Sequence, residues 1–471
     1  MKILRHSSLP QRNILSFKTV FKREENKSVQ TLGERPLPTT LKRSKYTVSK
    51  LFNDGTVLLY NLASDAVVLG NREDELETLL ENPSNDVSSA DIKHAADLFR
   101  EGFLLDPNED EDLKLAVVRE TALYDTGNEI KIAINPTLSC NARCEYCFEE
   151  GFRRGNMSER VIHCTARYIA EAVRKNDLVT FRWFGGEPLM APDVITDIIR
   201  LSHEYAQVPF RHKSTVLSNG SLVTDQIIEL FKDNWNVSEL HLTLDGDRGY
   251  HNRMKHYLDS SIDGFEAVLR SARKALEANI AVVCRINITK DNIDDIDFIA
   301  SEFDAMPNRD LLRIYPAPVR AHTDVSEPYC FSYDEYSDAY LRAMIVLRAH
   351  GYFAHIEDFM PKRKVTCCST RATDEIVIDQ DGRLYKCMQT ACRNQCSVGN
   401  VERGLILNEE LAKWVTPTTP DDCSDCIYMP ICQGGCKGFR SLNDPRISPC
   451  VNERYYLDAI LDLVHLIAVK E

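Results

Sequence analysis

The chain has 471 residues, of which 43% are hydrophobic and 27% charged, values typical of a globular protein with two or three domains. Its net charge of −14 argues against nucleic acid as the main partner. It has no apolar run long enough to cross a membrane and no signal-peptide core at its start, so we expect a cytoplasmic protein with no membrane partner. Sixteen cysteines in such a protein indicate metal or cluster ligands rather than disulfides.

Residues 1–44 are predicted to be a basic, flexible arm. Lys and Arg outnumber Asp and Glu here, apolar residues do not repeat, and Pro36-Leu37-Pro38 indicates an extended linker. Binding to an acidic partner is an alternative role for this segment.

Residues 45–115 are predicted to form a small domain that starts with a hairpin. Two strand-like runs, 46–52 and 56–60, flank Asp54-Gly55. Asp-Gly is a strong hairpin signal, because both central positions of the tight turn need a positive φ. A third strand is expected over 66–69.

Two helices are predicted after this sheet, at about 73–81 and 89–100, and Gly102 is placed to end the second. A small sheet followed by helices resembles the winged-helix precursor-peptide recognition domain fused to many peptide-modifying enzymes. The resemblance implies that the leader of a ribosomally synthesised precursor peptide binds here by adding a strand to the sheet. A structural cap on the next domain is the alternative.

Residues 128–351 alternate strand-like and helix-like segments, the pattern of βα units on a parallel sheet. A helix is expected over 332–350, where apolar and aromatic residues recur at three- and four-residue spacing. The strands are expected at 130–135, 179–184, 214–218, 239–244, 280–288 and 311–316.

Three cysteines, Cys140, Cys144 and Cys147, follow the first of these strands. Three thiolates can hold three irons of a 4Fe-4S cube and leave the fourth open, because soft sulfur ligands suit such clusters. A zinc site is the alternative, although it would normally need a fourth protein ligand nearby. The spacing Cys-x3-Cys-x2-Cys, with Tyr146 before the last cysteine, resembles the cluster motif of radical S-adenosylmethionine (SAM) enzymes. The resemblance implies an α/β fold with a partial (β/α)6 barrel whose open iron binds SAM.

Motifs at the ends of the later strands resemble other elements of this family, and in a barrel the chemistry gathers at the carboxyl ends of the strands. The residues implied to contact SAM are Tyr146, Gly185, Gly186, Glu187, Pro188, Ser218, Asn219, Arg253, Arg285 and Tyr315. Glu187 is implied to accept the amino group of SAM, and Arg253 to meet a carboxylate. For Arg253, a surface position is the alternative. For Arg285, a buried structural role is the alternative. We interpret His251 as a surface residue.

A second group of cysteines lies in residues 365–455, and its spacing resembles the SPASM extension of radical SAM enzymes. The resemblance implies two auxiliary 4Fe-4S clusters, which gives three clusters in all. The outer cluster would be held by Cys423, Cys426, Cys432 and Cys450, and the inner one by Cys368, Cys387 and Cys436. The fourth inner ligand stays open among Cys367, Cys392, Cys396 and a vacant position. A zinc ribbon over 423–436 is the alternative. Residues 456–471 are expected to be a carboxyl-terminal helix.

Together the resemblances imply a radical SAM peptide maturase that cross-links a precursor peptide. A thioether is favoured over a carbon-carbon or ether link. The radical is carried by the cofactor, so the sequence identifies no catalytic side chain. A reducing partner such as flavodoxin or ferredoxin is implied.

Two alternatives remain open. The first is anaerobic sulfatase maturation, which forms formylglycine. In that branch an Asp typically follows the cysteine at the position of Cys387, whereas Met388 and Gln389 follow it here. The second is a non-catalytic cluster or zinc protein that only binds peptides.

Overall fold

The computed structural model describes residues 1–5, 37–81, 89–124, 129–174, 177–320, 327–353, 355–364, 368, 375–416, 419–442 and 446–469. Most of the predicted arm and Cys367 lie outside these residues. None of the described helices is long and apolar enough to cross a membrane.

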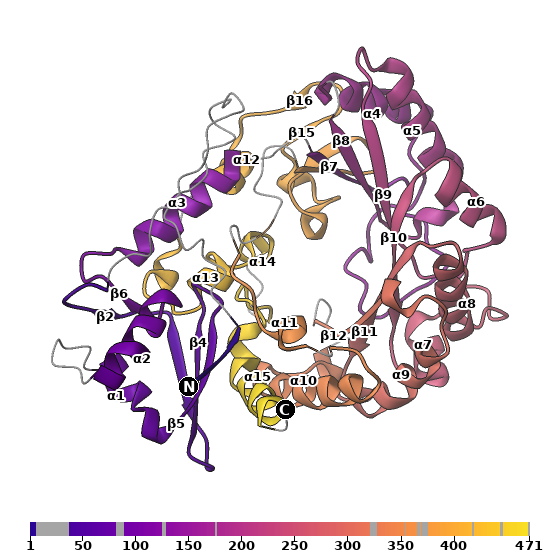
Figure 1. The fold of residues 1–471 in the computed structure, drawn as a ribbon. Coiled ribbons are helices and arrows are strands. Elements are labelled where there is room, and N and C mark those ends of the chain that lie inside the picture. The colour runs from indigo at the N-terminus through magenta and orange to yellow at the C-terminus, as the bar shows by residue number, and fades with distance from the viewer. Residues whose placement is uncertain are drawn as a thin grey trace.

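A curved parallel sheet of six consecutive strands forms the centre of the fold (Figure 1). Its strands are β7 (Glu129–Ile134), β8 (Leu178–Trp183), β9 (Arg211–Leu217), β10 (Val237–Leu244), β11 (Ala281–Ile288) and β12 (Leu312–Pro318). The predicted strands are confirmed, with ends that differ by no more than about three residues, a normal uncertainty for boundaries.

Helices alternate with these strands and lie on the outside of the curve (Figure 1). They are α4 (Glu159–Ala172), α5 (Pro192–Tyr205), α6 (Asp225–Asp233), α7 (Arg248–Lys255), α8 (Gly264–Glu277), α9 (Ile296–Asp304) and α10 (Tyr333–Ala349). The helix predicted over 332–350 is thus confirmed as α10.

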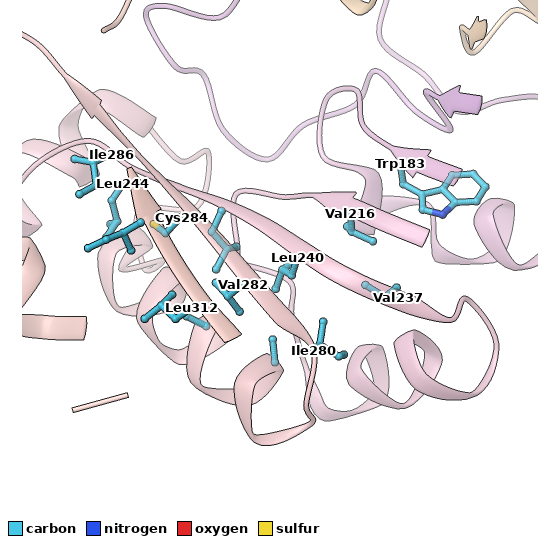
Figure 2. Packing of buried hydrophobic residues seen from close by; sticks show 14 of the residues in the cluster. Trp183, Val216, Val237, Leu240, Leu244, Ile280, Val282, Cys284, Ile286 and Leu312 are labelled. Carbon is cyan, nitrogen blue, oxygen red and sulfur yellow. The ribbon is translucent and has the colours of Figure 1, made fainter. Parts of the chain in front are cut away.

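The two sides of the central sheet differ in polarity. Toward the helices, apolar side chains such as Trp183, Leu240 and Val282 are fully buried (Figure 2). On the inner side, polar and charged side chains such as Arg182 and Lys213 line a cavity of about 480 Å³. Successive side chains of a strand point to opposite faces of the sheet. Each strand therefore contributes apolar residues to the outer face and polar residues to the inner face.

The amino-terminal part contains a four-stranded antiparallel sheet in the order β1-β5-β4-β3. These strands are β1 (Lys2–Arg5), β3 (Thr47–Leu51), β4 (Thr56–Asn61) and β5 (Val67–Asn71). The helices here are η2 (Arg72–Asp74), α1 (Leu76–Glu81), α2 (Ser89–Arg100) and α3 (Glu111–Tyr124), and β2 (Lys42–Arg43) pairs with β6 (Leu104–Leu105). The predicted hairpin and both predicted helices are confirmed, whereas α3 was not predicted.

The prediction of a flexible arm is wrong at both ends of residues 1–44. Residues 2–5 form β1 on the edge of β5, and residues 42–43 form β2 beside β6. Backbone pairing with distant strands orders these residues, although they carry no strand pattern of their own.

The carboxyl-terminal part continues the central sheet, because β13 (Glu375–Ile378) pairs parallel with β7. Antiparallel strands β14 (Arg383–Tyr385), β15 (Gly399–Asn400) and β16 (Gly404–Leu405) complete a sheet of ten strands. The helices of this part are α11 (Ile356–Phe359), α12 (Glu409–Val415), α13 (Met429–Cys432), α14 (Lys437–Leu442) and α15 (Glu453–Ala468). The last helix packs on α10, where the rings of Tyr340 and Tyr456 stack at 4.0 Å.

Candidate active site

The three cysteines of the first motif lie on the loop that leaves β7. Burial, with a smaller contribution from the Cys144 thiol, raises the pKa of Cys140 to about 11 and that of Cys147 to about 12. Within the described residues no three His, Cys, Asp or Glu side chains are placed to hold a single metal ion. Three neighbouring soft donors on one loop fit an iron-sulfur cluster, and its irons would supply the positive charge that thiolates need in a buried place.

The Gly-Gly-Glu-Pro turn after β8 packs directly against this cysteine loop. The N–H of Gly186 donates to the carbonyl of Thr137 at 3.1 Å, and that of Glu187 to the carbonyl of Ser139 at 2.9 Å. A Cβ on Gly186 would lie 2.3 Å from the Ser139 carbonyl oxygen. Gly185 is equally confined and has a φ of +124°. Glycine is therefore required at both positions if the two loops are to meet.

Glu187 is a buried acceptor where the turn meets β9, with 1% of the residue exposed. It accepts hydrogen bonds from the Ser218 hydroxyl at 2.9 Å and from the Asn219 N–H at 2.8 Å. Burial raises the pKa of Glu187 to about 7, although these donors lower it. A cation beside this carboxylate would offset its desolvation. The structure thus brings together three of the predicted SAM contacts around one buried carboxylate.

Asn219 also ties the end of β9 to the cysteine loop, because its Nδ2 donates to Oδ1 of Asn141 at 2.8 Å. Pro188 starts the short helix η3 (Pro188–Met190), whose N-cap is Glu187. The Glu187 carboxylate accepts from the Leu189 N–H at 3.1 Å, so the turn fixes the orientation of its own acceptor.

Tyr146 connects the cysteine loop to a buried ion pair at the ends of β10 and β11. Its hydroxyl donates to both carboxylate oxygens of Asp245 at 2.9 Å and accepts from Lys255 Nζ at 2.9 Å. Lys255 Nζ lies 3.2 Å from Asp245, and Asn287 Nδ2 donates to the same carboxylate at 2.6 Å. Burial alone would raise the pKa of Asp245, but the Lys255 charge holds it below its ordinary value. Lys255 Nζ also donates to Thr243.

His251 is completely buried in this network, so its interpretation as a surface residue is wrong. It lies one helical turn before Lys255 on α7, and residues four apart share one helix face. Its Nδ1 accepts from the Asp245 N–H at 3.2 Å, and burial lowers its pKa to about 4.

Arg253 lies on the other face of α7 and is exposed. Its guanidinium carbon lies 4.8 Å from the centre of the Tyr250 ring. Among the described residues, Lys255 reaches the Asp245 network from this helix together with His251, and the sequence analysis missed Lys255. The four-residue spacing from His251 to Lys255 was the available signal.

A model of the Radical SAM superfamily matches residues 134–302, which hold the cysteine loop, Glu187, Ser218, Asn219 and Asp245. Residues 134–302 are a radical SAM domain. The chain is therefore a radical SAM enzyme.

Two curated relatives are serine-type anaerobic sulfatase-maturating enzymes. That of Klebsiella aerogenes is 21% identical over 325 residues, which is 63% of this chain and 77% of the relative. That of Bacteroides thetaiotaomicron is 28% identical over 127 residues, which is 25% of this chain and only 29% of the relative.

Solved structures share the fold at low sequence identity. A structure of anSMEcpe with bound AdoMet has a TM-score of 0.56 and 15% identity, and covers 72% of this chain and 98% of its own. Streptococcus suis SuiB bound to S-adenosylmethionine has a TM-score of 0.50 and 15% identity, and covers 87% of this chain and 99% of its own.

Two further predicted SAM contacts lie on the inner side of the radical SAM domain. Arg285 on β11 is opposite Thr243 and Tyr315 in register. Its Nη2 donates to the Pro318 carbonyl at 3.2 Å, while its buried Nε has no hydrogen-bond partner among the described residues. Tyr315 is 37% exposed. Both side chains are thus placed toward the polar interior, two residues before the position of Asn287 along the strands.

The carboxyl-terminal cysteines of this radical SAM enzyme fall into two groups of neighbours. Burial, followed by the nearby Cys436 and Cys368, raises the pKa of Cys387 to about 12. In the second group, Cys426 and Cys432 are neighbours of Cys423, and Cys426 and Cys450 are neighbours of Cys432. These groups coincide with the inner and outer sets expected from the spacing, and their ligation of clusters stays a prediction.

Cys392 and Cys396 have other surroundings. The charged neighbours of Cys392 include Asp379 and Glu149, and those of Cys396 include Glu410. The thiols that raise the pKa of Cys387 are instead those of Cys436 and Cys368.

Proposed function

We propose that this radical SAM enzyme cross-links a ribosomally synthesised precursor peptide, with a thioether favoured over a carbon-carbon or ether link. When bound, SAM and the cluster supply a 5'-deoxyadenosyl radical that removes a hydrogen atom from the peptide. The chain supplies the site in which cofactor and peptide are held and oriented.

The observation that carries this proposal is the pairing of β13 with β7. The strand β7 leads into the cysteine loop, and β13 leads through β14 to Cys387 of the inner group. The sulfur-rich carboxyl-terminal part is thereby built onto the same sheet as the SAM site. Formation of a cross-link needs an electron acceptor near the SAM site, and an auxiliary cluster held by the inner cysteines would supply one.

The residues have separable roles in this account. Cys140, Cys144 and Cys147 hold the SAM-binding cluster. Glu187, positioned by Ser218 and Asn219, accepts the ammonium group of SAM. The pair of Asp245 and Lys255 fixes Tyr146 and so the cysteine loop.

A peptide is bound in a solved structure of a protein with the same fold. A structure of anSMEcpe contains bound AdoMet and the Kp18Cys peptide, at 16% identity to this chain. We propose that residues 45–115 bind the leader of the precursor peptide and that a flavodoxin or ferredoxin supplies electrons. The proposal includes three 4Fe-4S clusters per chain.

The test is anaerobic turnover of a cysteine-containing peptide encoded by a short reading frame beside the gene. We expect one equivalent of 5'-deoxyadenosine, loss of two hydrogen atoms from the peptide, and loss of one thiol that iodoacetamide can alkylate. Glu187→Gln is the matched variant that should fail to bind SAM. Deoxyadenosine formation with every peptide thiol still free would contradict the thioether.

Sulfatase maturation is the second candidate, because two relatives carry that name. It predicts an aldehyde on the peptide that reacts with a hydrazide, and no new link. Met388 and Gln389 after Cys387 count against it, since neither side chain is an Asp.

A further inference from the structure

One edge of the small amino-terminal sheet is filled by the chain's own first strand. β1 pairs antiparallel with β5, with Lys2 opposite Leu69 and Ile3 opposite Val68. Without β1, strand β5 would present a row of unpaired backbone N–H and C=O groups, which is a template for another strand. The edge where an incoming peptide would pair is therefore already occupied.

The opposite edge of this sheet is held against the last helix. Lys50 on β3 forms ion pairs with Asp458 at 2.8 Å and with Asp462 at 2.6 Å on α15. Just beyond β3, the Phe52 ring stacks on His465 at 3.8 Å. Figure 1 shows α15 beside this sheet. Contacts with α15 thus hold β3 in place. We therefore look for strand exchange at the other edge of the sheet, which is β5.

β1 has the features of a strand that can leave. It is four residues long, and its register with β5 shifts between Ile3 and Arg5. Such a bulge interrupts the ladder of hydrogen bonds. By contrast, β3 and β4 pair over five consecutive residues without a shift. Leu4 is only partly buried, at the margin of the main apolar cluster, whereas the Met1 side chain is 4% exposed and its ammonium group lies 3.1 Å from Asp74.

We propose that β1 is a placeholder strand, which an extended peptide displaces to pair with β5 in its stead. The displacing segment would run antiparallel to β5 and carry apolar residues where Met1 and Leu4 now pack. That the segment is the leader of a precursor peptide rests on the function proposed above. The exchange at the sheet edge does not depend on it.

The test uses the full chain and, as probe, a fluorescein-labelled synthetic peptide with the sequence of residues 1–10. The variant Ile3→Pro/Leu4→Pro opens the edge. Proline has no N–H, and two successive residues of a strand point their donors to opposite sides, so one of the two must face β5. Ser7→Pro/Ser8→Pro, placed after β1, is the matched control.

In the wild-type chain and the control variant, the tethered strand competes at a high effective concentration. We expect the probe to bind the Ile3→Pro/Leu4→Pro variant at least about tenfold more tightly than the wild-type chain or the control variant. A probe that carries the same two prolines should not bind. Hydrogen exchange at the amides of 67–71 should rise in the variant and fall again when the probe is added, which also shows that the variant is folded.

Equal affinity for all three proteins, or no binding to the variant at millimolar probe, would overturn the proposal. Formation of 5'-deoxyadenosine is measured in parallel on the same samples. If deoxyadenosine is absent while the probe still distinguishes the variants, the proposed function fails and the placeholder strand stands. If deoxyadenosine is formed but the probe binds all three proteins equally, the placeholder strand is rejected and the proposed function stands.

Discussion

Lys255 and Asp245 form an ion pair with 4% and 2% of their side chains exposed, and the ammonium nitrogen lies 3.2 Å from the carboxylate. The hydroxyl of Tyr146 bonds to both. This pair therefore holds the cysteine loop at a second place, in addition to the contacts with the Gly-Gly-Glu-Pro turn.

Replacing Lys255 by Met should destabilise the protein by about 3 to 5 kcal/mol, because it leaves the Asp245 charge buried and unpaired. Lys290→Met is the matched control. Its partner is Glu335 in a pair with 41% and 50% exposure, and its loss should cost less than about 1 kcal/mol. Chemical unfolding of the three proteins measures both values. Similar small losses in the two variants would contradict the structural role of the buried pair.

Gly186→Ala should separate the turn from the cysteine loop, because the new Cβ would lie 2.3 Å from the Ser139 carbonyl oxygen. A misplacement of about 1 Å can cost about 100-fold in rate. We therefore expect the rate of deoxyadenosine formation to fall by about this factor. Gly249→Ala on α7 is the control, since its nearest neighbour would lie at 3.5 Å. Wild-type rates of deoxyadenosine formation in both variants would contradict the close contact between this turn and the cysteine loop.

Glu187→Gln should make the stability difference from the wild type depend on pH. Burial raises the pKa of Glu187 to about 7, so the folded protein keeps this proton where the unfolded chain has lost it. Raising the pH from about 5 to about 8 thus lowers the wild-type free energy of unfolding through this group, by on the order of 2 kcal/mol. The Gln variant lacks the effect, so its stability relative to the wild type should rise over this range.

Unfolding curves of the cluster-free, SAM-free proteins at several pH values make this comparison. Other titrating groups cancel in the difference between wild type and variant. A difference that stays constant with pH would show that Glu187 is not buried as described.

Cys387→Ala should remove the inner auxiliary cluster and lower the iron content by about four per chain. Cys396→Ala is the control, because its neighbours include Glu410 rather than the inner thiols. SAM cleavage without peptide should survive in both variants. Equal iron loss in the two would mean that the inner ligands are wrongly assigned.

The sequence was sufficient for the parallel strands and the motifs at their ends. Buried parallel strands are apolar runs, and turns such as Gly185-Gly186 have chemistry that can be recognised without coordinates. The first cysteine loop, Glu187, Ser218 and Asn219 were accordingly found, and the structure brings them together.

The sequence alone did not predict features that depend on which face of a helix is buried or on which distant strands pair. His251 and Lys255 become site residues only because one face of α7 is buried, and Arg253 between them points elsewhere. The pairing of β13 with β7, and of β1 with β5, joins strands far apart in the chain. Such pairings depend on tertiary structure, because the local sequence of a short strand does not predict which strand it pairs with.

The most direct test is to reconstitute the chain anaerobically with iron and sulfide, add SAM and dithionite, and assay iron and 5'-deoxyadenosine. The account predicts about twelve irons per chain and deoxyadenosine formation that is abolished in Cys140→Ala/Cys144→Ala/Cys147→Ala. A chain that binds zinc instead of iron, or that forms no deoxyadenosine while its clusters are intact, would contradict it.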